Sequence, residues 1–532
     1  MTYTPLSITA QNRMSTQVST TGQKGLNLEG LPEMMKLEYA KKIINYIPYS
    51  YGIGLRGGIE KIFESAGDEV ITMLESWTDE YIIFGYGTTV ARYNIPTDTI
   101  TILKNDFSVN EGFGGLKYGD YFFVYNGYQG DRIHRMDLTT FTLVEVAAAP
   151  ACDTLIAIGP RLYAGATDEG YELVKYSSID DATNPPFTNW TVGTTATDAG
   201  EISFKNAGRV RSIAPLGPNI VVFSDNGYYA FTIDTIDSAG TLKKVDVTQD
   251  YTVDFGGARG AVTSPKGIFY LNEGGLWQLI QVGQTDVPYS EQKVLTSVLL
   301  SDEYFDNIDF SQTDIVWDDT RKLCLITYAQ DSGTNNKILG YKDSEEIKGL
   351  FEIDGWSLNR FMTFGDSLYA CSSVDGSVYK CFSGWNDDGL EIGATYTQEL
   401  PLNSLMNKHT LLNFYSKGFL SVDTEVDINF DIYDRDGAPQ SAKTIHRWSA
   451  QRNDNLQDGW GTANYGQSAW GGDYDLSAMV ESFDGCNPRI RNVQRASVRF
   501  TSSNLEPHII NWFSADIKDG ARIRRRKQTK IS

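Results

Sequence analysis

Gly119-Asp120-Tyr121-Phe122-Phe123-Val124 is the stretch that identifies the repeating structural unit of this 532-residue chain. Two turn-forming residues, glycine and aspartate, are followed at once by four aromatic or β-branched residues. Residues of the first kind favour tight turns, and those of the second kind favour strands that pack on a sheet. The stretch therefore predicts a short buried strand that is entered through a tight turn.

The same turn-then-strand pattern occurs six more times along the middle of the chain. It is found at residues 79–84, 159–164, 217–223, 266–271, 321–326 and 365–370. A second strand, in which apolar and polar residues alternate, follows at 131–137, 172–176 and 377–381. Successive copies begin roughly 40 to 57 residues apart, which is the spacing of four-stranded propeller blades with loop insertions.

This spacing predicts an all-β chain with a β-propeller of six or seven blades over residues 59–392. A string of β-sandwiches is the alternative, but sandwich strands would recur about every 8 to 12 residues without the longer period. The composition suits both architectures, because 30 Tyr, 25 Phe and 50 Gly are typical of many short strands joined by tight turns.

The residues before the repeats, 1–58, are predicted to form an N-terminal arm with one short helix. The helix is expected over Pro32–Ile47, with a proline near its start and with Pro48 ending it. Its apolar residues recur at helical spacings of three and four, at Met35, Tyr39, Ile43 and Tyr46.

The residues after the repeats, 393–532, are predicted to form a separate β-sandwich-like domain. The blade period is lost there, and longer strands such as 426–433 and 496–500 alternate strictly between apolar and polar residues. Strict alternation is the pattern of strands with one buried face and one exposed face.

Charge is distributed unevenly along the chain. The 46 Lys and Arg are outnumbered by 68 Asp and Glu, so that the formal net charge is −22 and polyanions and acidic membranes are repelled on average. The run Ala521–Lys530, in contrast, is strongly basic. It is interpreted either as a solvated terminus or as a tail that docks on an acidic neighbour or on phosphates. The docking residues would be Arg522, Arg524, Arg525, Arg526 and Lys527.

Neither a membrane segment nor a disulfide framework is expected. No apolar run approaches the roughly 18 residues that a membrane span needs, and the start of the chain lacks a signal-peptide pattern. The five cysteines have no C-x-x-C spacing and are interpreted as free thiols in a reducing compartment. A hairpin turn at Asp375-Gly376 would pair residue 371 with residue 380, which places Cys371 and Cys381 on opposite faces of the strands.

The candidate chemical motifs favour structural interpretations. Gly52, Gly54 and Gly57 spell a dinucleotide-binding fingerprint, but no strand precedes it and no helix follows, so a turn into the first blade is favoured. The adjacent carboxylate pairs 180–181, 318–319 and 387–388 are interpreted as solvated turns, although carboxylates from different blades could still converge in space.

Histidine is scarce, with four isolated residues, so neither a histidine metal cluster nor a Ser-His-Asp arrangement has local support. The sequence therefore predicts a protein that is not an enzyme and that has no cofactor and no metal.

Three stretches resemble the tail-nozzle or tail-stabilisation proteins of short-tailed bacteriophages. The first contains 25–30, 39–40 and 45–46 and closes on Gly52-Ile53-Gly54-Leu55-Arg56-Gly57-Gly58; the second contains 176–181, Trp190 and 222–227. The third contains 459–461, 468–470, 491–500 and 517–520. The likeness spans most of the chain, except for the basic tail.

The resemblance implies a virion protein of the phage tail, assembled in the host cytoplasm. It implies a ring of six copies below the portal and adaptor, with tail fibres or a needle as further partners, around the channel through which genomic DNA leaves. An acidic chain suits such a conduit, because each Lys or Arg that meets a phosphate would add affinity for the passing DNA.

Within such a ring, Trp190 and Trp385 would be candidate contacts between copies or, alternatively, would pack within a blade. Two other functions stay open. One is a propeller glycosidase, either a depolymerase or a sialidase-like protein, although no Asp-box repeat of the S-x-D-x-G-x-T-W form is present. The other is a carbohydrate-binding module.

Overall fold

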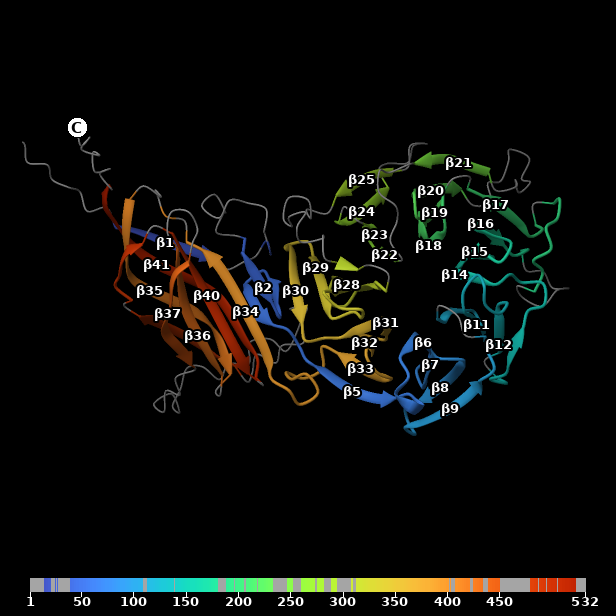
Figure 1. Cartoon of the computed structure of the whole chain (residues 1–532), viewed down its shortest axis with the longest axis horizontal. Helices are drawn as coiled ribbons and strands as arrows, with labels where there is room; N and C mark the ends of the chain where they lie inside the picture. Colours follow the sequence, from blue (N-terminus) through green and yellow to red (C-terminus); the bar gives the residue numbers. More distant parts are fainter. Residues whose placement is uncertain are drawn as a thin grey trace, which may run out of the picture. The chain divides into compact units, whose positions relative to one another are not determined.

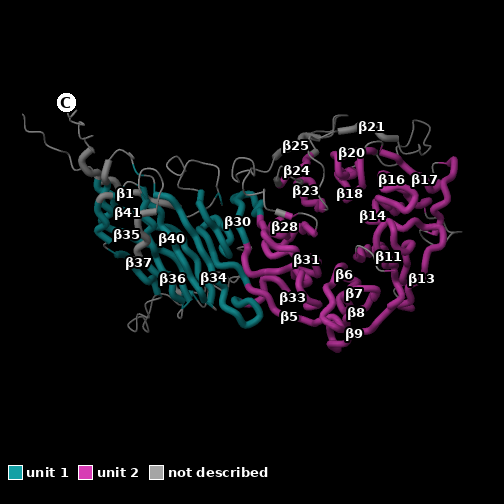
Figure 2. The backbone as a smooth tube through the Cα atoms, in the orientation of Figure 1, with its two compact units in different colours: residues 1–57, 341–352, 385–532 teal, residues 58–340, 353–384 magenta. Residues whose placement is uncertain are grey.

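A computed structural model shows that the described part of the chain is almost entirely β-strand and contains no α-helix. It divides into two compact units, which Figure 2 distinguishes by colour. Unit 1 contains residues 1–57, 341–352 and 385–532, and unit 2 contains residues 58–340 and 353–384. The structure describes residues 14–20, 24, 26, 39–108, 112–137, 139–179, 188–195, 197–204, 207–217, 219–232, 246–251, 260–272, 275–281, 289–293, 308–309, 312–400, 402, 407–421, 424–433, 439–449, 479–486, 488–493, 495–504 and 506–522.

Unit 2 is a β-propeller whose blades are antiparallel sheets of consecutive strands (Figure 1). The first three blades are β6 (Ile71–Thr78), β7 (Tyr81–Tyr86), β8 (Thr89–Asn94) and β9 (Thr99–Lys104); β10 (Gly114–Tyr118), β11 (Tyr121–Tyr125), β12 (His134–Asp137) and β13 (Leu143–Glu145); and β14 (Cys152–Ile158), β15 (Arg161–Thr167), β16 (Gly170–Tyr176) and β17 (Gly200–Ser203). The next two are β18 (Val210–Leu216), β19 (Asn219–Ser224), β20 (Gly227–Thr232) and β21 (Asp246–Tyr251), and then β22 (Ala261–Ser264), β23 (Gly267–Asn272), β24 (Gly275–Gln281) and β25 (Tyr289–Lys293).

The last blades differ in how they are completed. One is built on β27 (Ile315–Asp318) and β28 (Leu323–Gln330), with β26 (Ile308–Asp309) also on β28, and continues through β29 (Lys337–Asp343) and β30 (Lys348–Asp354). The final blade is β31 (Leu358–Phe364), β32 (Ser367–Ser372), β33 (Ser377–Cys381) and β5 (Ile59–Glu64). Six blades are thus separate four-stranded sheets, whereas β27 and β28 belong to a ten-stranded sheet.

The predicted propeller is confirmed, and each copy of the turn-then-strand pattern forms the second strand of a blade. Residues Phe122, Phe123 and Val124 of β11 are completely buried, as the opening stretch of sequence predicted. Phe122 and Val124 pack with Met73 and Ile83 of the preceding blade. Hydrophobic burial between neighbouring blades therefore holds the ring together.

Strand β5 closes the ring, because the start of unit 2 supplies the outermost strand of the final blade. β5 pairs antiparallel with β33, with Ile59 opposite Cys381 and Glu64 opposite Ser377. Phe63 of β5 stacks on Tyr93 of the first blade, with ring centroids 4.2 Å apart. The sequence-based expectation that Ile59–Phe63 enters the first blade is therefore wrong, because this strand completes the last blade instead.

Unit 1 contains two groups of strands that enclose an aromatic core. One group is β2 (Lys42–Ile44), β34 (Ile392–Glu399), β40 (Arg495–Asn504), β36 (Glu425–Tyr433) and β37 (Pro439–Ser449). The other is β1 (Met14–Thr20), β3 (Tyr46–Tyr49), β4 (Gly52–Leu55), β41 (His508–Arg522), β35 (Asn407–Ser421), β38 (Met479–Cys486) and β39 (Ile490–Val493). Phe414 of the second group meets Phe430 and Phe500 of the first, with ring centroids 5.2 and 6.2 Å apart. The predicted sandwich-like packing is present.

The predicted N-terminal helix is wrong over the residues that the structure describes. Residues 42–49 form β2 and β3, and residues 32–38 lie outside the described part. Ile43, Tyr46 and Ile47 are buried in unit 1, where β2 pairs with β34 and β3 with β4. Tertiary burial of β-branched and aromatic residues overrides a spacing that also fits a helix.

The unit boundaries also place the N-terminal residues differently from a free arm. Residues up to 57 belong to the same unit as the C-terminal strands, and the propeller ends at residue 384, whereas the sequence pattern placed these limits at 58 and 392. Residues 341–352, which contain the end of β29 and most of β30, are likewise part of unit 1, where Ile44 of β2 pairs in parallel with Glu352 of β30.

The five cysteines are free thiols, as predicted, but the register of the Cys371 hairpin was wrong. Cys371 lies opposite Val378, and Cys381 lies opposite Leu368. The loop is longer than a two-residue turn because the Ser372 hydroxyl accepts hydrogen bonds from the amides of Val374 and Asp375, at 3.1 and 3.2 Å.

Replacing Phe63 with alanine tests the closure of the ring. The side chain is 6% exposed and packs against both the first and the last blade, so we expect Phe63→Ala to lower the free energy of unfolding by about 3–5 kcal/mol. Ile102→Ala is the matched control, because Ile102 on the outer strand β9 is 53% exposed and should change stability by less than about 1 kcal/mol. Urea titration of both variants measures the difference; equal effects would contradict this account of β5.

Candidate functional site

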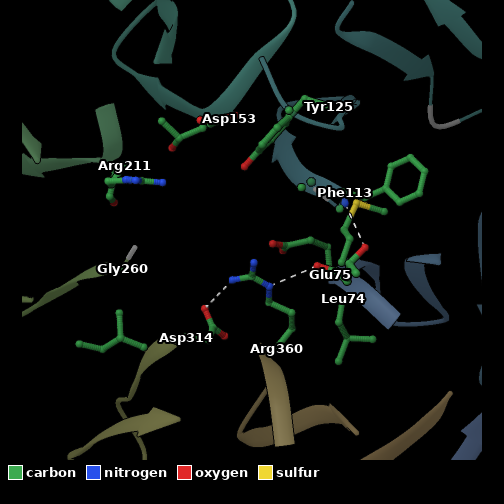
Figure 3. A pocket seen from close by; sticks show the side chains of 18 of the residues that line it. Leu74, Glu75, Phe113, Tyr125, Asp153, Arg211, Gly260, Asp314 and Arg360 are labelled. Atoms are coloured by element: carbon green, nitrogen blue, oxygen red, sulfur yellow. Dashed lines mark hydrogen bonds and ion pairs between the residues drawn. The ribbon is translucent and has the colours of Figure 1, made fainter. Parts of the chain in front are cut away.

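A central cavity of about 380 Å³ lies within unit 2, where the first strands of the blades converge (Figure 3). Its wall is formed by residues in or just before the first strands β6, β10, β14, β18, β22, β27 and β31, and by Tyr125 and Gly127 at and just after the end of β11. The charged and phenolic residues in the wall come from different blades and are Glu75, Tyr125, Asp153, Arg209, Arg211, Asp314 and Arg360.

One side of the cavity is organised by Arg360 of β31. Its Nε donates a hydrogen bond to the carbonyl oxygen of Thr72 at 3.2 Å, and its Nη1 lies 3.3 Å from Asp314 Oδ1. The second carboxylate oxygen of Asp314 accepts the amide of Phe361 at 2.8 Å. Burial raises the pKa of Asp314, and the Arg360 guanidinium opposes this effect by stabilising the ionised form.

Glu75 of β6 faces this pair without a cation of its own among the described residues. Burial raises its pKa to about 8, the nearby Asp314 carboxylate adds to the shift, and Arg360 reduces it. One guanidinium therefore serves two carboxyl groups. Near neutral pH Glu75 carries a proton and can donate a hydrogen bond into the cavity.

The other side of the cavity presents two arginines near the start of β18. Arg209 Nε bonds Asp153, whose other carboxylate oxygen accepts the amide of Tyr128 at 2.9 Å. Arg211 Nε lies 2.6 Å from Asp225 Oδ1. In Figure 3 the Arg211 side chain reaches into the cavity opposite Glu75. Asp153 and Asp225 thus hold the two arginines in place from behind.

Two glycines at the start of β10 leave room for the side chains of Tyr125 and Glu75. A β-carbon at Gly114 would come within 2.2 Å of the Tyr125 ring. A β-carbon at Gly115 would lie 2.9 Å from both Glu75 Cγ and Met73 Sδ. Any larger residue at these positions would displace Tyr125 or Glu75, so the local sequence shapes the cavity wall.

The sequence reading missed these cavity residues. The inner strands that carry them do not share the turn-then-strand pattern, which marks only the second strand of each blade. Convergence of carboxylates from different blades was left open, and the structure brings together Glu75, Asp153 and Asp314. Within the described part of the chain, no group of three His, Cys, Asp or Glu side chains is arranged to hold a metal ion.

The carboxylate pairs that were singled out lie elsewhere. Asp318 is 3% exposed and bonds Arg321, so it is a buried structural residue rather than a solvated one. Asp319 bonds Lys322 at 2.8 Å at the surface. Asp387 is bound by Arg56, and residues 180–181 lie outside the described residues.

Of the candidate partner contacts, only some fall on described residues. Trp190 is 3% exposed and packs in a core with Phe123 of β11 and Leu162 of β15, so it packs between two neighbouring blades rather than within one. Trp385 is half-buried in unit 1. Arg522 is the last residue of β41, and Arg524, Arg525, Arg526 and Lys527 lie outside the described residues.

Residues of the glycine fingerprint have structural tasks in unit 1. Gly52 has a positive φ of 145°, and a β-carbon there would lie 2.2 Å from the carbonyl oxygen of Ile510. Arg56 is completely buried and binds Asp387 through both terminal nitrogens, at 2.8 and 2.6 Å. Its Nε donates to Asn45 Oδ1 at 2.9 Å. The segment forms strand β4 rather than the predicted turn into the first blade.

Comparison with known proteins identifies no family. No protein-family profile and no curated protein matches the chain. Among solved structures, a chain of a mitotic checkpoint complex is 11% identical, with 66% of this chain and 96% of that one covered and a TM-score of 0.38. BamB from Moraxella catarrhalis is 12% identical, with 63% and 93% covered and a TM-score of 0.36.

The extracellular domain of a hybrid two-component system from B. thetaiotaomicron is 10% identical, with 67% of this chain and 43% of that one covered and a TM-score of 0.42. These likenesses concern the propeller fold alone. In the part of the chain that the structure describes, no helix has the length and apolar character needed to cross a membrane.

The protonation of Glu75 predicts a pH-dependent stability. Because its folded-state pKa is raised, its contribution is fully present below the pKa of the unfolded chain, about 4.5, and is lost as pH rises through about 8. We expect Glu75→Gln, which stays neutral, to be more stable than the unchanged protein at pH 9 by on the order of 5 kcal/mol and to gain nothing at pH 4.5.

Thermal unfolding at the two pH values measures this difference. Glu145→Gln on the outer strand β13 is the control, since Glu145 is exposed and the substitution should behave alike at both values. An equal gain for Glu75→Gln at pH 4.5 and pH 9 would show that Glu75 ionises normally.

The buried Arg56–Asp387 pair predicts a large and specific loss of stability within unit 1. Arg56→Ala leaves the Asp387 carboxylate without its guanidinium, and we expect a loss of about 3–5 kcal/mol. Arg447→Ala is the matched control, because Arg447 is 62% exposed beside Glu425 and Asp427 and should cost less than about 1 kcal/mol. Denaturant unfolding of both variants decides; equal losses would be inconsistent with a structural role for Arg56.

Proposed function

We propose that this chain is a structural protein of a short-tailed bacteriophage tail, a nozzle or hub subunit that forms a ring around the exit path of the genome. The main support for the proposal is where the residues that resemble the tail proteins lie in the structure. Where the structure describes them, none of them lines the central cavity, although Asp225 among them bonds the lining residue Arg211.

Several residues in the resembling stretches have structural roles. Gly52 allows the close approach of β4 to β41, and Arg56 forms the buried ion pair with Asp387. In the propeller, Trp190 and Phe223 are core residues, and the Ser177 hydroxyl accepts the amide of Leu162 at 3.0 Å. A family likeness that is carried by such residues favours a shared scaffold over a shared reaction.

The charge of the chain supports a role beside DNA without binding it. A net charge of −22 repels the phosphate backbone, which is the property that a conduit requires. In the proposed assembly, a ring of six copies meets the adaptor or connector at one end and tail fibres or a needle at the other. The basic residues Arg522, Arg524, Arg525, Arg526 and Lys527 dock on an acidic neighbour, and the site of action is the virion tail after assembly in the host cytoplasm.

A propeller glycosidase is the second candidate, and one observation favours it. Glu75, Asp153 and Asp314 from three blades line a single cavity, and glycosidases use two carboxyl groups separated by about 5 to 10 Å. Against it, Arg209 binds Asp153 and Arg360 binds Asp314, so two of the three carboxylates are already engaged. The scaffold proposal is therefore preferred.

The mass of the assembled protein tests the scaffold proposal. Six copies of a 59.2 kDa chain give a ring of roughly 350 kDa, which light scattering or native mass spectrometry would detect in the purified or virion-derived protein. A chain that ends at residue 521 should still form a ring of this size but bind the neighbouring tail proteins less tightly than the full chain, with the largest difference at low salt, where charge attraction is least screened.

A stable monomer that cleaves a polysaccharide would overturn the proposal in favour of the glycosidase. If the shortened chain attached as tightly as the full chain at low salt, docking by the basic residues would be rejected while the ring itself would stay in place.

A further inference from the structure

The central cavity presents hydrogen-bond donors that the protein itself does not use. The terminal nitrogens of Arg211 have no partner among the described residues, because only its Nε is bound, to Asp225. Arg360 likewise uses Nε and Nη1, which leaves Nη2 without a described partner. The side chains of Arg211 and Arg360 are 22% and 38% exposed, so both guanidinium groups are open to the cavity.

The cavity also offers groups that can bind hydroxyls. The Glu75 carboxyl has no cation partner in the described part of the chain, and Figure 3 shows it facing Arg360 and Asp314. Tyr125 points its hydroxyl end into the same space. Thr154 and Ser212 add hydroxyl-bearing residues to the wall. Guanidinium groups on one side and carboxyl and hydroxyl groups around them match a ligand with one acid group and several alcohols.

We infer that the central cavity binds a small polyhydroxylated carboxylate, an acidic monosaccharide, with its carboxylate on Arg211 and its hydroxyl groups on Glu75 and Tyr125. A planar guanidinium that is held from behind by Asp225 can receive a carboxylate with two parallel hydrogen bonds. A cavity of about 380 Å³ is within the range of pockets that enclose small ligands.

The charge balance distinguishes this ligand from other small anions. Asp153 is paired with Arg209 and Asp314 with Arg360, so a doubly charged phosphate would meet two acidic side chains at close range and would find both of these arginines already engaged. A singly charged carboxylate can be bound by the two terminal nitrogens of Arg211 alone. Hydroxyl groups, in turn, can both donate to these carboxylates and accept from Tyr125 and from protonated Glu75.

This inference goes beyond the scaffold proposal, because a ring that conducts DNA needs no ligand inside each propeller. The two fail independently: the mass of the assembly does not depend on whether the cavity is occupied. Binding without turnover would also leave the glycosidase candidate unsupported.

Isothermal titration of the full chain with sodium D-glucuronate, and separately with D-glucose, tests the inference. At pH 6.5 we expect saturable one-site binding of glucuronate and at least tenfold weaker binding of glucose, which lacks the carboxylate. Arg211→Gln should weaken glucuronate binding about tenfold or more. Lys117→Gln, at an exposed position of β10, should leave it unchanged.

A pH series provides a second readout that does not depend on the Arg211 variant being folded. Glu75 is faced by Asp314, Arg360 and Tyr125, and above pH 8 its ionised form would repel the ligand carboxylate. Affinity for glucuronate should therefore fall about tenfold between pH 6.5 and pH 9 in the unchanged protein and stay nearly constant in Glu75→Gln. Absence of binding at millimolar glucuronate, or equal affinity for glucose, would overturn the inference.

Discussion

Pairing of β5 with β33 is the interaction on which the propeller depends. A ring of blades has a first and a last member, and until they are joined each has a face that hydrophobic packing cannot cover. β5 supplies backbone hydrogen bonds to the last blade, while Phe63 packs on Phe84 and Tyr93 of the first. One strand therefore contacts both the first and the last blade and holds the start and the end of the unit together.

A closed ring brings the inner strands of all its blades to a common axis, and this geometry creates the central cavity. The inner strand of each four-stranded blade is an edge strand that is paired on one side only, so backbone groups and side chains together line the cavity; the Thr72 carbonyl of β6, for example, accepts a hydrogen bond from Arg360. Asp314 and Arg360 on one side and Asp153 and Arg209 on the other neutralise each other, which limits the cost of burying charge. Glu75 is left without a cation and keeps its proton instead.

In unit 1 the two ends of the chain are held in the same sheets. β4 lies against β41, and the buried Tyr46 hydroxyl is 2.7 Å from His508 Nε2, which is itself 3.2 Å from Ser502 Oγ. Burial lowers the pKa of His508 to about 4, so the ring stays neutral within this network. Residues near position 50 therefore depend on partners more than 450 positions away. The local sequence pattern does not reveal these partners, so it predicts a separate N-terminal arm.

Much of the fold could be predicted from the sequence, because the second strand of each blade is marked locally. A turn pair followed by buried aromatic and β-branched residues, as at Gly119–Val124, specifies a strand wherever it stands, and its spacing specifies a propeller. The segment 42–49 was misassigned because its apolar spacing fits a helix and a strand equally, and only burial in unit 1 decides between them. The cavity residues Glu75, Asp314 and Arg360 lie more than 40 positions apart in the sequence. No turn-then-strand pattern or other local motif identifies them. Their roles exist only once the ring has closed, since proximity across blades, and with it the raised pKa of Glu75, is a property of the tertiary structure.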